Sequence, residues 1–198
     1  MLSPFYSKGL IEAGCDEAGR GCLAGPVIAA AVIFPKGYIN EEIDDSKKLP
    51  PAKREILKDE IIRHAADFAI GMADNEEIDH YNILGATMIA MHRALKNLKT
   101  RPEFIIVDGN RFIPYEGIPH LCIVKGDSRY LSIAAASILA KTYRDDLMRR
   151  LSKDYPGYGW EKNAGYPTRS HRASIRVQGI SPLHRKSFRL LENTPDLF

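Results

Sequence analysis

Four acidic residues lie where the sequence predicts strand ends or the start of a helix. Asp16 and Glu17 follow one apolar run, Asp108 follows a second, and Asp127 precedes a long helical pattern at the N-cap position. Carboxylates that gather at strand ends, without a Cys/His set, are hard oxygen ligands suited to Mg²⁺ or Mn²⁺. The predicted chemistry is phosphodiester hydrolysis with two metal ions, one activating a water and the other stabilising the leaving oxygen.

Each carboxylate also has an ordinary alternative role. Asp127 could simply cap its helix, and Asp108 could be a turn residue before Gly109. Asp16 and Glu17 are adjacent, so on a regular strand they point to opposite faces. Both reach one site only if the strand bends or ends there, which the glycines that follow permit.

The pattern of apolar runs and proline or glycine breaks predicts strands first, then strands alternating with helices. This order implies a three-layer α/β domain with a small helical C-terminal subdomain. Expected strands are Gly9–Cys15, Ala24–Phe34, Phe68–Met72, Phe104–Val107 and Leu121–Val124. Expected helices run from Pro50-Pro51 to about His64, from Asn82 to Leu98, and from Asp127 to Leu151.

Charge is unevenly distributed along the 198 residues, although the net charge is only +3. Residues 141–198 hold 12 Lys/Arg and 6 Asp/Glu, or +6, so residues 1–140 hold the remaining 16 and 19, or −3. A basic C-terminal third suits a polyanionic partner, and a solvated helix surface explains it equally well. Three cysteines without a paired spacing, no membrane-length apolar run and no secretory signal predict a cytoplasmic enzyme.

A glycine pattern, Gly19-x-Gly21-x-x-Ala24, matches a dinucleotide-binding fingerprint by spacing. That motif needs a helix to begin immediately, with the phosphate at the helix N-terminus. Here Gly25-Pro26 and a β-branched run follow instead. The sequence therefore argues against a nucleotide cofactor.

Seven segments together resemble the motifs of the bacterial ribonuclease HII family, in the family's order and across nearly the whole chain. They are Asp16–Val27, Asp45–Leu49, Val107–Asn110, Lys125–Asp127, Ser132–Lys141, Gly165–Thr168 and His184–Phe188. The resemblance implies a ribonuclease H-like fold, a mixed sheet flanked by helices, with a C-terminal helical extension. We expect a catalytic domain over residues 1–152 and the extension over 153–198.

The resemblance also implies an activity. The protein would be an endonuclease that hydrolyses the RNA strand of RNA–DNA hybrids. It would also cut 5′ of ribonucleotides embedded in duplex DNA, leaving 3′-OH and 5′-phosphate ends. Asp16, Glu17, Asp108 and Asp127 would bind the two Mg²⁺ or Mn²⁺ ions. A general ribonuclease H-like nuclease and a silent hybrid-binding module are the rival hypotheses.

Substrate recognition is implied for Gly19, Arg20 and Gly21, which match the loop that recognises the ribose 2′-hydroxyl. A loop with two glycines brings backbone groups close to a sugar because no Cβ intervenes. That hydroxyl is what distinguishes RNA from DNA at a site. Tyr166 matches the tyrosine that packs on the sugar beside the RNA–DNA junction; alternatively it packs within its subdomain.

Five other residues are weaker candidates for substrate binding. Lys47 and Lys48 could bind phosphates or be solvated, and Ser137 and Lys141, one helical turn apart, could support the site or pack. His171 could assist leaving-group or phosphate chemistry.

The aromatic residues of the C-terminal third and the chain end complete the predictions. Tyr155, Tyr158 and Trp160 fit a small core better than a nucleic-acid platform. The final Leu197-Phe198 faintly resembles tails that dock on the sliding clamp, and fraying is the alternative. We expect a monomer.

Overall fold

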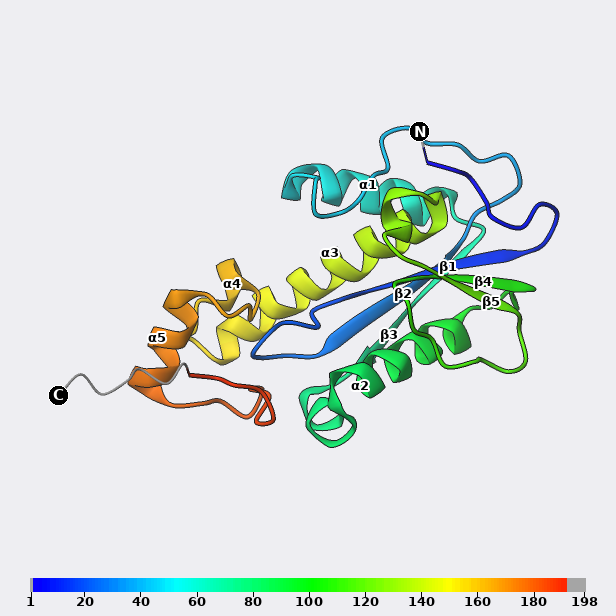
Figure 1. Cartoon of the computed structure of the whole chain (residues 1–198). Coiled ribbons are helices and arrows are strands. Elements are labelled where there is room, and N and C mark those ends of the chain that lie inside the picture. The colour runs from blue at the N-terminus through cyan, green and yellow to red at the C-terminus, as the bar shows by residue number, and fades with distance from the viewer. Residues whose placement is uncertain (1, 192–198) are drawn as a thin grey trace.

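A five-stranded mixed sheet forms the centre of the protein (Figure 1), of which the computed structural model describes residues 2–191. The strand order is β3-β2-β1-β4-β5. Strand β2 is antiparallel to both its neighbours, whereas β1, β4 and β5 are parallel to one another. The strands are β1 Glu12–Ala18, β2 Val27–Ile33, β3 Asp67–Ala73, β4 Phe104–Asp108 and β5 His120–Ile123. Strand β4 ends at Asp108, and its parallel neighbour β1 carries Asp16 and Glu17 just before its end at Ala18.

Helices cover both faces of the sheet and produce the three expected layers. Helices α1 (Pro51–His64) and α3 (Leu131–Asp154) lie on one face, and α2 (Asn75–Asn97) lies on the other (Figure 1). The far half of α3 extends past the sheet, where α4 (Trp160–Asn163) and α5 (Arg169–Gln178) pack beside it. No helix within residues 2–191 is long and apolar enough to cross a membrane.

Alternating side chains of β2 fill two separate cores. Val27, Ala29 and Ala31 pack against α2, while Ile28 and Ala30 pack towards α1 and α3. Burial on both faces explains why this strand appears in the sequence as a continuous apolar run.

Helix α3 approaches β1 very closely. A Cβ placed on Gly14 would lie 2.4 Å from the backbone carbon of Ser132. Only a residue without a side chain is therefore accommodated at this crossing. The close approach brings α3 directly over the strand that carries Asp16.

The predicted bounds of β1 and α2 need correction. Strand β1 begins at Glu12 and runs to Ala18, so Asp16 and Glu17 lie inside it. Helix α2 begins earlier than predicted, where Asp74 and Glu77 form a reciprocal capping box. The predicted start, Asn82, is instead an internal kink whose φ is 59°.

The prediction that Asp127 is the N-cap of the long helix is wrong. A 3-10 turn, η1 (Gly126–Ser128), contains Asp127, and the N-cap of α3 is Tyr130. Asp127 lies at the end of a connection from β5 and is 4% exposed. A capping role therefore does not account for its burial.

The C-terminal region has a core of its own, as predicted from its aromatic residues. Tyr158 and Trp160 stack with ring centroids 5.1 Å apart, and Met148 and Ile175 pack with them. Leu23 and Ala24 belong to the same cluster, so this core includes residues from the beginning of the chain. The division between residues 152 and 153 stays a prediction; α3 runs to Asp154.

Candidate active site

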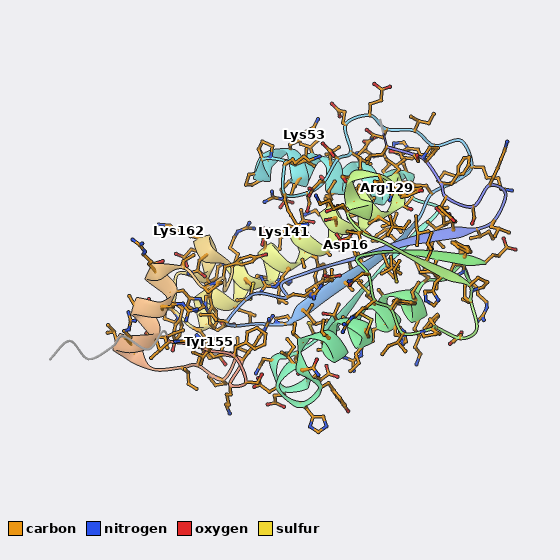
Figure 2. The ribbon with its side chains drawn as sticks, viewed as in Figure 1. Asp16, Lys53, Arg129, Lys141, Tyr155 and Lys162 are labelled. Atoms are coloured by element: carbon orange, nitrogen blue, oxygen red, sulfur yellow. The ribbon has the colours of Figure 1, made fainter. Side chains whose placement is uncertain are left out.

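Three of the four predicted carboxylates converge above the ends of β1 and β4. One oxygen each of Asp16, Asp108 and Asp127 lies within 4.8 Å of the other two. Asp16 is on β1, Asp108 is the last residue of β4, and Asp127 is in the turn before α3. Figure 2 shows Asp16 on the strand beside α3, with Lys141 farther along that helix. Chain segments more than a hundred residues apart thus form one acidic centre.

The clustering of negative charge is reflected in the titration of the acidic groups. Burial and the charges of Glu17 and Asp108 raise the pKa of Asp16 well above its usual value. Burial and the charge of Asp127 also raise the pKa of Asp108. A hard divalent cation bound by these oxygens would remove this repulsion, and the group contains no sulfur or nitrogen ligand. The residues therefore fit a divalent metal site.

Glu17 lines the same cleft but is not one of the three converging carboxylates. Its Oε1 pairs with Arg20 Nη1 at 3.1 Å. Burial raises the pKa of Glu17, and the charge of Asp108 acts in the same direction. The cleft opens across the end of β1, so adjacent residues of alternating direction both line it. Glu17 therefore lies beside the acidic centre, with its carboxylate paired to Arg20.

Lys47 provides the positive charge nearest to Asp127. Its Nζ donates to Asp127 Oδ2 at 3.1 Å, although its side chain is 74% exposed. Lys48 instead pairs with Asp44 and is absent from the lining of the cleft. Of the two predicted lysines, therefore, only Lys47 lies at the acidic centre.

Helix α3 supplies two predicted residues to the cleft. The Ser137 hydroxyl lowers the pKa of Asp16 by hydrogen bonding to it, against the larger effect of burial. Ser137 Oγ also lies 2.8 Å from Ser46 Oγ. One turn later, Lys141 Nζ pairs with Asp145 Oδ1 at 2.7 Å. Ser137 therefore supports a carboxylate directly, and Lys141 adds a charge to the rim.

The segment Gly19-Arg20-Gly21 forms one wall of the cleft beside Asp16. Gly19 has a φ of +95°, which favours glycine, while Gly21 has open space around its Cα. Within residues 2–191, the N–H groups of Arg20 and Gly21 have no hydrogen-bond partner. The loop thus presents two free backbone donors next to the carboxylates.

Tyr166 also lines the cleft and is 36% exposed. Lys141 Nζ lies 5.1 Å from the centre of its ring, within the range of a cation–π contact. The ring therefore offers a partly open flat surface towards the cleft.

His171 is not in the cleft, which contradicts a direct role in phosphate chemistry. It is fully buried, and Trp160 Nε1 donates to its Nε2 at 3.0 Å. The ring proton is therefore on Nδ1, which donates to the Tyr166 carbonyl at 2.9 Å. His184 Nε2 completes the group, 3.2 Å from His171 Nε2. Since both its ring nitrogens are engaged, His171 holds the backbone behind Tyr166.

Sequence reasoning missed Ser46, Arg54, Arg144 and Arg185. Ser46 and Arg54 line the cleft, and Arg54 Nη1 donates to the Ser46 carbonyl at 3.1 Å. Arg144 and Arg185 are fully buried behind the glycine loop. Arg144 could have been found from the sequence, because it is a charged residue within the apolar stripe of α3. Ser46 and Arg185 lie within the family motifs Asp45–Leu49 and His184–Phe188.

A model of the family described as Ribonuclease HII matches residues 13–191. The chain belongs to the ribonuclease HII family. Ribonuclease HII of Parabacteroides distasonis is 59% identical over 191 residues, 96% of each chain. Ribonuclease HII of Cytophaga hutchinsonii is 54% identical over 198 residues, 100% of this chain and 98% of that one.

Solved structures agree with this assignment. The ribonuclease H2 of Pyrococcus horikoshii has a TM-score of 0.75 at 25% identity, covering 90% of this chain and 94% of that one. Ribonuclease HII of Archaeoglobus fulgidus, in its complex with PCNA, has a TM-score of 0.74 at 27% identity, covering 96% and 100%. This ribonuclease HII is thus a metal-dependent hydrolase with the ribonuclease H fold, acting on RNA–DNA hybrids.

Proposed function

We propose that this ribonuclease HII also cuts 5′ of single ribonucleotides embedded in duplex DNA, leaving 3′-OH and 5′-phosphate ends. The observation that carries the proposal is one cleft that combines two functions. Asp16 and Asp108 line it together with the Gly19-Arg20-Gly21 loop. Within residues 2–191, the N–H groups of Arg20 and Gly21 in this loop have no hydrogen-bond partner. Acidic groups and free backbone donors in one cleft suit hydrolysis at a sugar that carries an extra hydroxyl.

Asp16, Asp108 and Asp127 would hold two Mg²⁺ or Mn²⁺ ions, with Glu17 as the fourth ligand. When bound, the ions would supply an activated water and stabilise the charge that develops on the leaving oxygen. The protein's own part is to hold the carboxylates. The N–H of Gly126 donates to Asp108 Oδ1 at 2.7 Å, and the N–H of Glu17 donates to Asp16 Oδ1 at 2.7 Å. Asp16 and Asp108 thus each have one oxygen fixed by a backbone N–H.

The glycine loop would recognise the ribose through its 2′-hydroxyl. A hydroxyl both donates and accepts, so free N–H groups at Arg20 and Gly21 can bind its oxygen. A deoxyribose at the same place would leave these donors unpaired as water is excluded, which disfavours DNA. Tyr166 would contact the next sugar, where a flat ring leaves no room for a 2′-hydroxyl.

Positive side chains at the rim would bind the nucleic-acid backbone. Lys47 and Lys141 lie at the cleft, and Arg20 is exposed beside Glu17. Lys48 would act farther along the strand if it releases Asp44. Phosphate contacts of this kind position a duplex without reading its sequence.

The test uses a labelled DNA duplex with one ribonucleotide, an all-DNA duplex and an RNA–DNA hybrid, each with Mg²⁺, Mn²⁺ or EDTA. We expect a single metal-dependent cut immediately 5′ of the ribonucleotide and no cut in the all-DNA duplex. Cleavage of the all-DNA duplex would instead favour a general nuclease. Cleavage of the hybrid alone would restrict the enzyme to longer RNA.

A clamp partner and the oligomeric state are further parts of the proposal. The Archaeoglobus relative is described in complex with PCNA. Here the predicted clamp contact, Leu197-Phe198, lies outside the described residues, so it stays a prediction. We expect a monomer.

A further inference from the structure

Two fully buried arginines lie behind the glycine loop. Arg144 projects from α3, and Arg185 lies on the segment after α5. Both have side chains with no solvent exposure, and each donates three hydrogen bonds to backbone carbonyls. Burying a guanidinium ion is unfavourable unless its donors are satisfied, so these contacts must form together. We call this pair the arginine clamp.

Arg185 binds the glycine loop itself. Its Nη2 donates to the Gly19 carbonyl at 2.7 Å and its Nη1 to the Arg20 carbonyl at 2.9 Å. Its Nε donates to the Gly25 carbonyl at 2.9 Å, where the loop leads into β2. One planar group therefore fixes both ends of the turn.

Arg144 joins the loop region to the segment that carries Tyr166. Its Nε and Nη2 each donate at 3.0 Å, to the carbonyls of Pro26 and Ala24. Its Nη1 donates to the Ala164 carbonyl at 2.7 Å. The N–H of Leu23 also donates to the Gly165 carbonyl at 2.8 Å. Hydrogen bonds thus connect the glycine loop region to the segment that carries Tyr166.

The two loop glycines differ in what surrounds them. A Cβ on Gly19 would lie 2.0 Å from Arg144 Nε, whereas a Cβ on Gly21 would meet nothing within 4 Å. Gly19 is therefore required by the clamp itself. Gly21 is not constrained by packing, so its small size serves whatever enters the cleft.

We propose that Arg144 and Arg185 are positioning residues that determine the ribonucleotide specificity of the loop. By holding the carbonyls of Gly19 and Arg20 from behind, the clamp leaves the N–H groups of Arg20 and Gly21 directed into the cleft. The donors are then in place before substrate arrives, which avoids the entropic cost of ordering them on binding. This inference rests on the proposed reading of the 2′-hydroxyl by the loop.

The decisive variant is Arg185→Lys, which keeps the charge but loses the planar set of donors. Arg172→Lys is the matched control. Arg172 Nη1 also donates to backbone carbonyls of the C-terminal region, those of Arg189 and Leu190, but not to the loop. The measured quantity is discrimination. It is the inhibition constant of an all-DNA duplex divided by KM for the same duplex with one ribonucleotide.

We expect Arg185→Lys to lower this ratio about tenfold, the scale of one lost hydrogen bond. The inhibition constant of the all-DNA duplex should stay within about twofold, since phosphate contacts are intact. Arg172→Lys should leave the ratio unchanged. A merely structural role for Arg185 predicts that both duplexes weaken together; that outcome, or an unchanged ratio in folded Arg185→Lys, would overturn the inference.

A second measurement needs no variant and covers the case in which Arg185→Lys does not fold. Backbone ¹⁵N relaxation of the unliganded wild-type protein reports the order of Arg20 and Gly21. A clamped loop should have order parameters of about 0.85, like β1, and values below about 0.6 would refute the clamp. If wild-type enzyme shows no discrimination at all, the proposed function fails and the specificity role of the clamp fails with it. If wild-type enzyme discriminates but the loop order parameters are low, only the clamp inference fails.

Discussion

The acidic centre and the arginine clamp lie on either side of the same loop, and they solve opposite problems. Burial, together with the charge of Asp108 on Asp16 and of Asp127 on Asp108, raises the pKa values of Asp16 and Asp108. Arg144 and Arg185 are more deeply buried, yet each of their guanidinium nitrogens donates to a backbone carbonyl. The acidic centre is incomplete without a cation from outside, whereas the clamp is complete within the chain.

This difference separates chemistry from recognition. Groups that must bind a cation are left electrostatically unsatisfied, which favours binding. Groups that must hold a shape are fully satisfied, which favours rigidity. Substitutions should therefore affect the acidic centre and the arginine clamp separately.

Asp108→Asn should lower single-turnover cleavage of an RNA–DNA hybrid by at least about a hundredfold, the scale of removing one charge-stabilising group. The amide keeps an acceptor for the Gly126 N–H but removes a charge from the acidic centre. Asp146→Asn is the control, because Asp146 pairs with Arg149 and with Lys58 of α1 and does not line the cleft. A loss of less than tenfold would exclude Asp108 from the centre.

Gly19→Ala should destabilise the protein by about 3 kcal/mol, combining backbone strain at positive φ with overpacking against Arg144. Gly21→Ala should change stability by less than about 0.5 kcal/mol, because its Cβ has open space. Urea unfolding measures both. Equal effects at the two glycines would show that the clamp does not require Gly19.

Acid should weaken the C-terminal core through His184. Burial and the neighbouring His171 lower the pKa of His184 to about 4. The unfolded chain takes up this proton near pH 6.5 and the folded chain only near pH 4, so stability falls as pH drops through this range. The loss would reach about 3 kcal/mol.

His184→Asn isolates that contribution, because the amide oxygen can still accept from the Ser181 N–H. Urea unfolding of both proteins between pH 7 and pH 4 should show a shallower decline for the variant. Parallel curves would mean that His184 does not stay neutral in the core.

Removing charge from the acidic centre should stabilise the metal-free protein. In EDTA, Asp108→Asn should raise the free energy of unfolding, because burial and the charge of Asp127 disfavour the ionised carboxylate that the variant lacks. A thermal scan should show a higher unfolding midpoint for the variant. A lower midpoint in EDTA would contradict the repulsion that the structure implies.

The acidic centre could be predicted from sequence because its signals are local. Each carboxylate follows an apolar run or precedes a helix, and strand ends meet at one edge of a sheet. The same reasoning misassigned Asp127 as a helix cap, because a 3-10 turn before α3 leaves no trace in apolar spacing. It also missed the first part of α2, whose capping box at Asp74 and Glu77 was readable.

The clamp could not be predicted in this way. Arg185 binds Gly19 and Arg20, more than 160 residues earlier in the chain. No spacing rule connects residues so far apart. An arginine in a basic segment is predicted from sequence to lie on the solvated surface. His171 was misplaced for a related reason, because its partner Trp160 is set by the packing of the C-terminal core.

Equilibrium binding by Asp108→Asn tests whether ribonucleotide recognition by the loop is separate from cleavage at the acidic centre. Fluorescence anisotropy in Mg²⁺ would compare a duplex containing one ribonucleotide with the same duplex made of DNA. We predict that this variant cleaves neither duplex within the measurement but still binds the ribonucleotide duplex more tightly, because the clamped loop is untouched. Equal affinity for both duplexes would contradict the account and place recognition in the acidic centre itself.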